Sequence, residues 1–200
     1  EDGGIEIAKA LKNKHNLTKL GLSNNRIGQE GAVALADSLK DKMFLVKLGL
    51  ECNSIGPEGI AEIASSLANN TSLTDLFLSA NNMKNDGLVA VAKILKNKVN
   101  LVVIGLEGNM ISDADGFASF GEAIIDCVKL ERLFLNNNFI GTKAAVSIGK
   151  ALASTKSLRE LNLSHNLIND DGGEAIAEGL AKNMSLLKLQ LSSNEIGNIS

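Results

Sequence analysis

Leucine recurs along the chain at a nearly constant interval. The segment LTKLGLSNNRIG, from Leu17 to Gly28, returns in related form through the rest of the sequence. The first leucines of these copies lie at residues 17, 45, 73, 101, 130, 158 and 186, so successive steps are 28 or 29 residues long. Copies that keep one phase over such a length indicate an array of structural repeats rather than a single globular core.

Within each copy, the spacing of apolar residues changes from strand-like to helical. Leucines alternate with other residues in the first part, as in Leu20, Gly21 and Leu22, which predicts a short strand. Apolar residues then recur every three or four positions, as between Gly31 and Leu39, which predicts a helix. Each repeat is therefore expected to be a strand, a turn and a helix. The predicted helices end near Leu39, Leu67, Leu95, Ile124, Leu152 and Leu180.

Two kinds of residue mark the predicted helix starts. Pro57 stands just inside one of them, where the missing backbone N–H costs nothing. Acidic residues occupy the first turns, where the positive end of the helix dipole favours a carboxylate. These acids are Glu30, Glu58, Asp86, Asp115 and Asp171.

Stacking of such units dictates a curved shape. Paired strands lie ~4.8 Å apart, whereas packed helices need ~8–10 Å between their axes. We therefore predict an α/β fold, a right-handed βα solenoid with a parallel sheet on its concave face and helices on its convex face. Residues 1–200 are expected to form a single domain of about seven repeats. The helical pattern from Gly3 to Leu11 opens the chain inside a repeat, without a visible polar cap, so we expect a fragment of a longer array.

An asparagine follows every predicted strand at the same position of the repeat. We expect this column to be structural, because its side chains can hydrogen-bond turn backbone groups of neighbouring repeats that burial would otherwise leave unpaired. An active site is not predicted there. The column consists of Asn25, Asn53, Asn81, Asn109, Asn138, Asn166 and Asn194.

The repeat motif, L-x-x-L-x-L-x-x-N-x-I-G-x-x-G, resembles the leucine-rich repeat, in the 28-residue variety of ribonuclease inhibitor and the NOD-like receptors. Ribonuclease inhibitor often has cysteine where this chain keeps asparagine, so the chain is more similar in style to the NOD-like arrays. The resemblance implies a protein–protein interaction scaffold within a larger intracellular signalling or sensor protein. Similar arrays also form a GTPase-activating protein of the Ran regulator type and actin-binding cytoskeletal modules such as the tropomodulin C-terminal domain, which stay as alternatives.

Two phenylalanines distinguish the face that the strands would present to a partner. Phe77 and Phe134 occupy a concave-face position that is glycine in several other repeats. Gly105 and Val103 lie between them, which predicts a small apolar slot with two aromatic walls. An aromatic anchor with a charged rim is typical of a protein-binding hot spot. The predicted rim consists of Asp75, Glu107 and Arg132.

Composition and charge narrow the range of partners. The formal net charge is -3, from 20 Lys and Arg against 23 Asp and Glu, and the charges are interspersed without a basic stripe for nucleic acid. No apolar run approaches the ~20 residues that span a bilayer, and nothing resembles a signal peptide. Cys52 and Cys127 are too few for a disulfide framework or a zinc site. We expect another protein as the partner, no nucleic acid, membrane, metal or cofactor, and a cytoplasmic location.

No catalytic constellation is predicted, and we do not expect an enzyme. Cys52 and His165 hold equivalent positions in repeats four apart, on the order of 19 Å from each other, which is too far for a thiol–imidazole pair. The segment around Asp113 and Asp115 imitates part of a calcium loop. Its first ligand position would be Ile111, which cannot coordinate a cation.

Overall fold

Strands and helices alternate along the chain in this computed structural model, which describes residues 2–112 and 116–197. The helices are α1 (Asp2–Leu11), α2 (Gly28–Leu39), α3 (Gly56–Ser66), α4 (Lys84–Leu95), α5 (Gly116–Asp126), α6 (Thr142–Ser154) and α7 (Asp170–Lys182). The strands are β1 (Lys19–Gly21), β2 (Lys47–Gly49), β3 (Asp75–Phe77), β4 (Val103–Gly105), β5 (Arg132–Phe134), β6 (Glu160–Asn162) and β7 (Lys188–Gln190). The predicted succession of strand, turn and helix is confirmed, and the helices end within two residues of the predicted positions.

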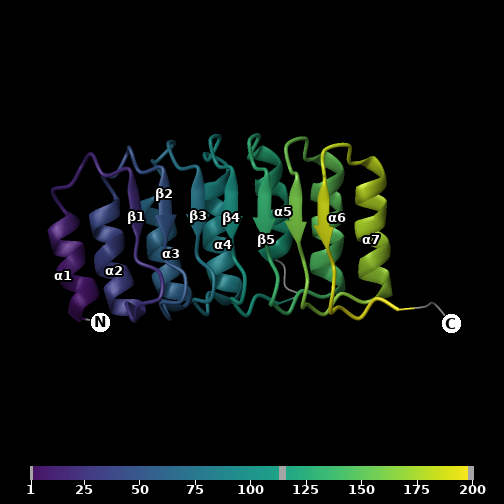
Figure 1. Ribbon diagram of the computed structural model, residues 1–200, viewed down its shortest axis with the longest axis horizontal. Helices are drawn as coiled ribbons and strands as arrows, with labels where there is room; N and C mark the ends of the chain where they lie inside the picture. The colour runs from purple at the N-terminus through teal and green to yellow at the C-terminus, as the bar shows by residue number, and fades with distance from the viewer. Residues whose placement is uncertain (1, 113–115, 198–200) are drawn as a thin grey trace.

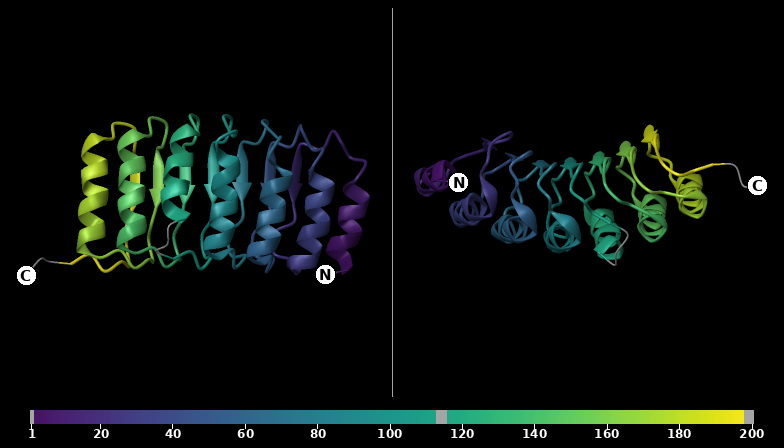
Figure 2. Two further views of the ribbon diagram at one scale, coloured as in Figure 1. Left: turned by 180° about the vertical axis from the view of Figure 1, so that it is seen from behind. Right: turned by 90° about the horizontal axis from the view of Figure 1, so that it is seen from below.

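The strands described here form one seven-stranded parallel sheet in chain order (Figure 1). Equivalent residues of successive repeats are partners, so that Leu20 lies opposite Leu48 and Leu48 opposite Leu76. Figure 2 shows the helices as a second layer that covers one face of the sheet, and the stack bends so that the sheet lies on the concave side. The α/β solenoid is therefore confirmed, and its curvature follows from the closer spacing of strands than of helices.

A continuous hydrophobic core fills the space between the two layers. Strand leucines such as Leu48, Leu76 and Leu133 meet helix residues such as Leu35 and Ile63, and all of them are at most 1% exposed. Since each repeat contributes only one thin slice, no repeat can bury its apolar face without its neighbours. Stability therefore depends on what holds the slices in register.

A left-handed turn follows each strand of the sheet. The residue before each column asparagine has a φ between 55° and 64°, and only one of these residues, Gly108, is a glycine. Side-chain-bearing residues accept this conformation at a cost of roughly 1–2 kcal/mol each, so neighbouring contacts must hold the turn. The other residues at this position are Asn24, Cys52, Ala80, Asn137, His165 and Ser193.

The asparagine column supplies those contacts. Asn81 donates from Nδ2 to the carbonyls of Leu50 (2.8 Å) and Leu78 (3.0 Å). Its Oδ1 accepts from the backbone N–H groups of Asn53 (3.0 Å) and Ile55 (3.4 Å) of the preceding repeat. Each of these asparagines thus pairs backbone groups of two repeats, and we call the row the asparagine ladder. Equivalent bonds to the preceding repeat recur at Asn53, Asn109, Asn138, Asn166 and Asn194.

A second polar row closes the opposite edge of the stack, where the helices end. Lys98 Nζ donates to the carbonyl of Leu67 (2.8 Å), and Asn183 Nδ2 donates to that of Leu152 (2.7 Å). The residue types along this row differ, so no sequence motif reveals it. Its described members are Lys42, Asn70, Lys98, Cys127, Thr155 and Asn183.

We expect Asn81→Ala to lower the free energy of unfolding by about 2–4 kcal/mol, because it leaves buried backbone groups of two repeats without partners. Asn25→Ala is the matched control, since Asn25 is exposed and bonds only to carbonyls of its own repeat, those of Leu22 and Ser23. Urea denaturation followed by circular dichroism measures both. Equal losses in the two variants would show that the ladder does not couple repeats.

Lys98 predicts a pH dependence of stability. Its ammonium is 1% exposed, and desolvation lowers its pKa from 10.5 to about 8. Between these two values the unfolded chain holds a proton that the folded chain has lost, so stability rises with pH across this window. We expect the free energy of unfolding of the wild type to rise by roughly 1–3 kcal/mol relative to Lys98→Met between pH 8 and 10.5. A flat or falling difference would contradict the burial of a charged Lys98. The surface substitution Lys96→Met serves as the matched variant.

Candidate functional site

The concave face of the sheet is built from the strand residues on either side of each buried central residue. Because strand side chains alternate between faces, the first and last residues of every strand point away from the core. The strand register aligns them into two rows. The first row reads Lys19, Lys47, Asp75, Val103, Arg132, Glu160 and Lys188, and the second reads Gly21, Gly49, Phe77, Gly105, Phe134, Asn162 and Gln190.

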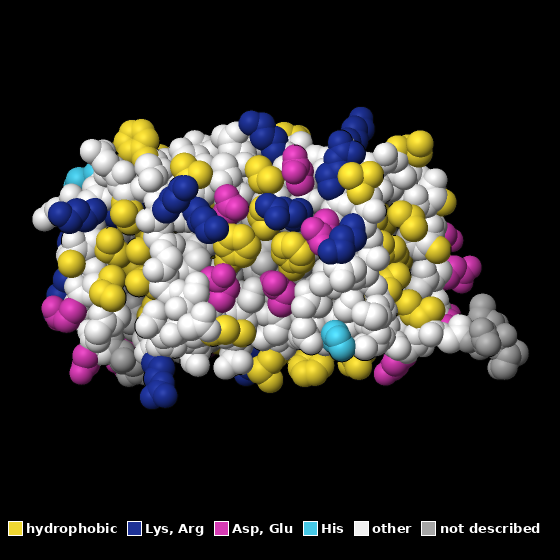
Figure 3. Space-filling model, viewed as in Figure 1, with side chains coloured by type: hydrophobic (Ala, Val, Ile, Leu, Met, Phe, Trp, Pro, Cys, Tyr) yellow, Lys and Arg dark blue, Asp and Glu magenta, His cyan; other side chains and the backbone are white. Residues whose placement is uncertain are grey.

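Two half-buried aromatic side chains interrupt the second row. Phe77 ends β3 and Phe134 ends β5, and both pair in register with Gly105 of the intervening strand β4. Lys47 Nζ lies 4.9 Å from the centroid of the Phe77 ring, a cation–π contact that covers part of the ring. Figure 3 shows apolar side chains over the middle of this face, with acidic and basic side chains next to them.

The space between the two rings is filled. A Cβ atom at Gly105 would lie 3.0 Å from Cδ1 of Phe77 and 2.9 Å from Oε2 of Glu107, so both side chains lean over this glycine. Val103 is only 1% exposed, although it stands outside the main hydrophobic core. The slot expected from the sequence is therefore filled at residue 105 by the Phe77 and Glu107 side chains, for which the glycine leaves room, and the two half-buried rings form a patch.

The charged residues around this patch differ in whether neighbouring side chains bind them. Asp75 accepts a hydrogen bond of 2.5 Å from Thr74 Oγ1, and Glu107 accepts one from Ser79 Oγ. Arg132 is exposed, and it forms no ion pair with any described residue. The acids are thus held in place by neighbouring hydroxyls, while the guanidinium remains available to a partner.

A third row follows the strands and includes Glu107, which was predicted as part of the rim. Ser23 donates to Glu51 as Ser79 does to Glu107, and Ser192 donates to Ser164 Oγ over 2.9 Å. Asn136 occupies the same row, and its Oδ1 is buried without a hydrogen-bond partner among the described residues. Together the rows offer two aromatic rings, a free guanidinium and fixed acceptors, which is chemistry suited to recognising a surface.

The residues weighed for catalysis do not come together. Cys52 follows β2 and His165 follows β6, so both are exposed but four strands apart. Cys127 is 1% exposed, and desolvation raises the pKa of its thiol to about 12. A buried thiol with this pKa stays protonated at neutral pH and is a poor nucleophile.

The described residues contain neither a cluster of metal-ligating side chains nor a helix that could span a membrane. His, Cys, Asp and Glu side chains do not gather there in groups of three that could hold a metal ion. Asp113 and Asp115, which imitate a calcium loop, lie outside the described residues. Among residues 2–112 and 116–197, the helices lack the length and apolar character that a bilayer crossing requires.

Comparison with known proteins identifies the repeat. A family model described as "Leucine Rich repeat" matches residues 13–36, 42–64, 69–92, 156–177 and 182–199, which is more than half of the chain. The central segment without a match contains the single 29-residue step, yet its strands keep the common register. Among curated proteins, none matches the sequence.

Two solved structures share the architecture. One is the actin-binding site 2 of leiomodin-1, with a TM-score of 0.58 and 21% identity, over 67% of this chain and 78% of that one. The other is internalin C2 from Listeria monocytogenes, with a TM-score of 0.51 and 22% identity, over 96% of this chain and 77% of that one. At these identities the likeness establishes the fold alone.

Proposed function

Because the chain belongs to the leucine-rich repeat family, we propose that it is a protein-recognition module that binds another protein on its concave face. Phe77 and Phe134 are the anchors of this interface, with Val103 and Gly105 beneath them and Asp75, Glu107 and Arg132 around them. The observation that carries the proposal is the pair of half-buried rings at a row position held by glycine in three other strands. Binding rather than catalysis is the role of this face.

Burial of the two phenyl rings against a partner would be energetically favourable. Aromatic side chains bury a large area at little cost in conformational entropy, which is why they are enriched among residues that dominate binding energy. Phe77 and Phe134 are already half-buried, and the Lys47 ammonium contacts the Phe77 ring. A partner would remove the remaining exposed parts of both rings from water.

Arg132 and the fixed acids would set the orientation of the partner. Charges at an interface rim contribute more to specificity and association rate than to affinity. A partner that fits should carry an apolar projection for the rings and an acid that reaches the Arg132 guanidinium, which can form a two-pronged hydrogen bond with a carboxylate.

We further propose that the module belongs to a larger intracellular signalling or sensor protein. The 28-residue period and the unbroken asparagine column support a relationship to ribonuclease-inhibitor-like arrays in the style of NOD-like receptors. A cytoplasmic location is supported by the two cysteines, which are both free thiols.

Actin binding is the second candidate function. The observation that favours it is the shared architecture with the actin-binding site 2 of leiomodin-1. Co-sedimentation with filamentous actin, and binding of monomeric actin in solution, test it directly. Absence of binding in both assays removes this candidate and leaves the concave-face proposal in place.

We expect Phe77→Ala/Phe134→Ala to weaken partner binding by about 2–4 kcal/mol, the usual cost of truncating two aromatic anchors. Both rings lie outside the main core, so the thermal midpoint should change far less than binding. The measurement is affinity capture with the wild type and the variant, followed by calorimetry with each purified partner that the variant loses.

Phe44→Ala/Phe139→Ala is the matched control, since it also removes two phenyl rings. These residues are 59% and 48% exposed and lie in loops outside the strands of the concave face. The control variant should bind as the wild type does. A partner held equally well by all three proteins would place the interface elsewhere.

A further inference from the structure

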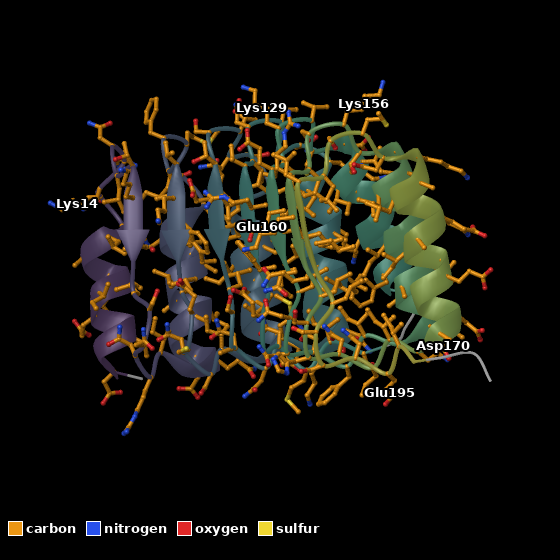
Figure 4. The ribbon with its side chains drawn as sticks, turned by 45° about the vertical axis from the view of Figure 1, so that its right-hand side comes forward. Lys14, Lys129, Lys156, Glu160, Asp170 and Glu195 are labelled. Atoms are coloured by element: carbon orange, nitrogen blue, oxygen red, sulfur yellow. The ribbon has the colours of Figure 1, made fainter. Side chains whose placement is uncertain are left out.

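Parallel stacking separates charge between the two edges of the array. All helices run in one direction, so their C-termini and the loops that follow them share one edge, which we call the strand-start edge. Figure 4 shows Lys129 and Lys156 at this edge and Asp170 and Glu195 at the opposite one. Exposed acids at the strand-start edge are Asp37, Asp41, Asp126 and Glu131, and exposed cations there are Lys12, Lys14, Lys40, Lys96, Lys129, Lys156, Arg159 and Lys182. Asp37 forms ion pairs with Lys12 and Lys40.

One cleft on this edge gathers three of those cations. It lies between the ends of α6 and α7 and has a volume of about 400 Å³. No acidic side chain lines it, and its cations form no ion pairs with the described residues. The lining side chains that matter are Lys156, Arg159, Lys182, Ser154, Ser185 and Met184.

An unusually close contact between α6 and α7 shapes the floor next to this cleft. A Cβ atom at Gly179 would lie 2.2 Å from the backbone oxygen of Gly149, so the two helices touch through their backbones. Small residues along this contact leave an adjoining groove of about 300 Å³, which shares Ser154 and Lys182 with the cleft. Lys150 and Glu178 line the groove as well, and their opposite charges leave the cations gathered in the cleft itself.

Helix capping does not account for these cations. A lysine near a helix C-terminus commonly complements the dipole there. At the end of α6 the Leu152 carbonyl accepts from Thr155 Oγ1 (3.3 Å) and Asn183 Nδ2 (2.7 Å), and the Thr155 carbonyl accepts from Asn183 Nδ2 (3.1 Å). Lys156 and Arg159 lie beyond the end of α6, and Lys182 alone of the three stands in a last helical turn.

The wall of the cleft is held in place before any ligand arrives. Arg159 Nη1 donates to the carbonyl of Ser185 over 3.1 Å, which fixes the guanidinium and leaves other N–H groups for a ligand. Asn183 Oδ1 accepts from the backbone N–H groups of Ser185 (2.9 Å) and Leu186 (2.8 Å), which orders the loop that carries Ser185.

We propose that this cleft binds a phosphate monoester. Such a group carries a charge of about -1.5 to -2 near neutral pH and three strong acceptor oxygens, which match three cations better than a single carboxylate does. The cleft is larger than the phosphate itself, and Met184, which is 95% exposed, offers apolar contact to the attached group. The monoester is either a soluble phosphate ester or the headgroup of a membrane lipid, and the site is separate from the concave face.

The test uses two probes, phenyl phosphate in solution and vesicles of phosphatidylcholine with or without phosphatidic acid. Binding is followed by nuclear magnetic resonance shifts of the Ser154, Lys156, Arg159 and Ser185 amides for the first probe, and by co-sedimentation for the second. We expect saturable binding of at least one probe, weakened about tenfold or more in Lys156→Gln/Lys182→Gln. Lys14→Gln/Lys96→Gln removes the same charge from the same edge outside the cleft and should bind as the wild type does.

Each result of these experiments either supports or overturns the phosphate site. Binding of phenyl phosphate supports the site with a soluble ligand, and binding only of vesicles with phosphatidic acid supports it with a lipid headgroup. Saturable binding of neither probe overturns the proposal, as does equal weakening in the two lysine variants, which would reveal general attraction to the edge. Phe77→Ala/Phe134→Ala should leave phosphate binding unchanged, so failure at one site is distinguishable from failure at the other.

Discussion

Several buried backbone groups in the turns of this array are paired by an asparagine side chain of the next repeat. The Oδ1 atom of Asn81 accepts from two N–H groups of the preceding repeat, and its Nδ2 donates to carbonyls on both sides of the junction. A buried backbone group without a partner costs ~1–3 kcal/mol, so every junction favours one register strongly. The left-handed turns, the parallel sheet and the continuous core all follow from that register.

Within each strand, different residues face the hydrophobic core and the concave surface. The central residue of each strand is committed to the core, while the residues on either side of it are free to vary because the ladder, and not their packing, sets the register. The second row can therefore hold glycine in β2 and phenylalanine in β3 without a change of fold. Parallel helices likewise bring all their C-termini to one edge, where lysines collect and where the α6–α7 contact opens a cleft.

Much of this architecture could be predicted from the sequence, since the repeated leucines and asparagines report directly on stacking. The rows of the concave face followed from the period alone, because equivalent residues must be neighbours in a parallel sheet. The filling of the predicted slot could not be foreseen, since it depends on how the Phe77 and Glu107 side chains lean over Gly105.

Other features escaped prediction for related physical reasons. Lys98, Cys127 and Asn183 perform one task with unrelated side chains, so the row at the helix ends has no recognisable motif. The groove next to the cleft is lined by Gly149 and Gly179, whose backbones touch, and a glycine in a helical pattern does not show which neighbouring helix approaches it.

Hydrogen exchange of individual backbone amides tests the ladder most directly. The N–H groups of Asn53, Asn81 and Asn109 each donate to the Oδ1 of the next asparagine along the ladder, at 2.9–3.0 Å. If the ladder couples the repeats, these loop amides should exchange as slowly as those of the sheet, through global unfolding alone. Exchange at the rate of exposed loop amides would contradict the ladder as the interaction that holds the array together.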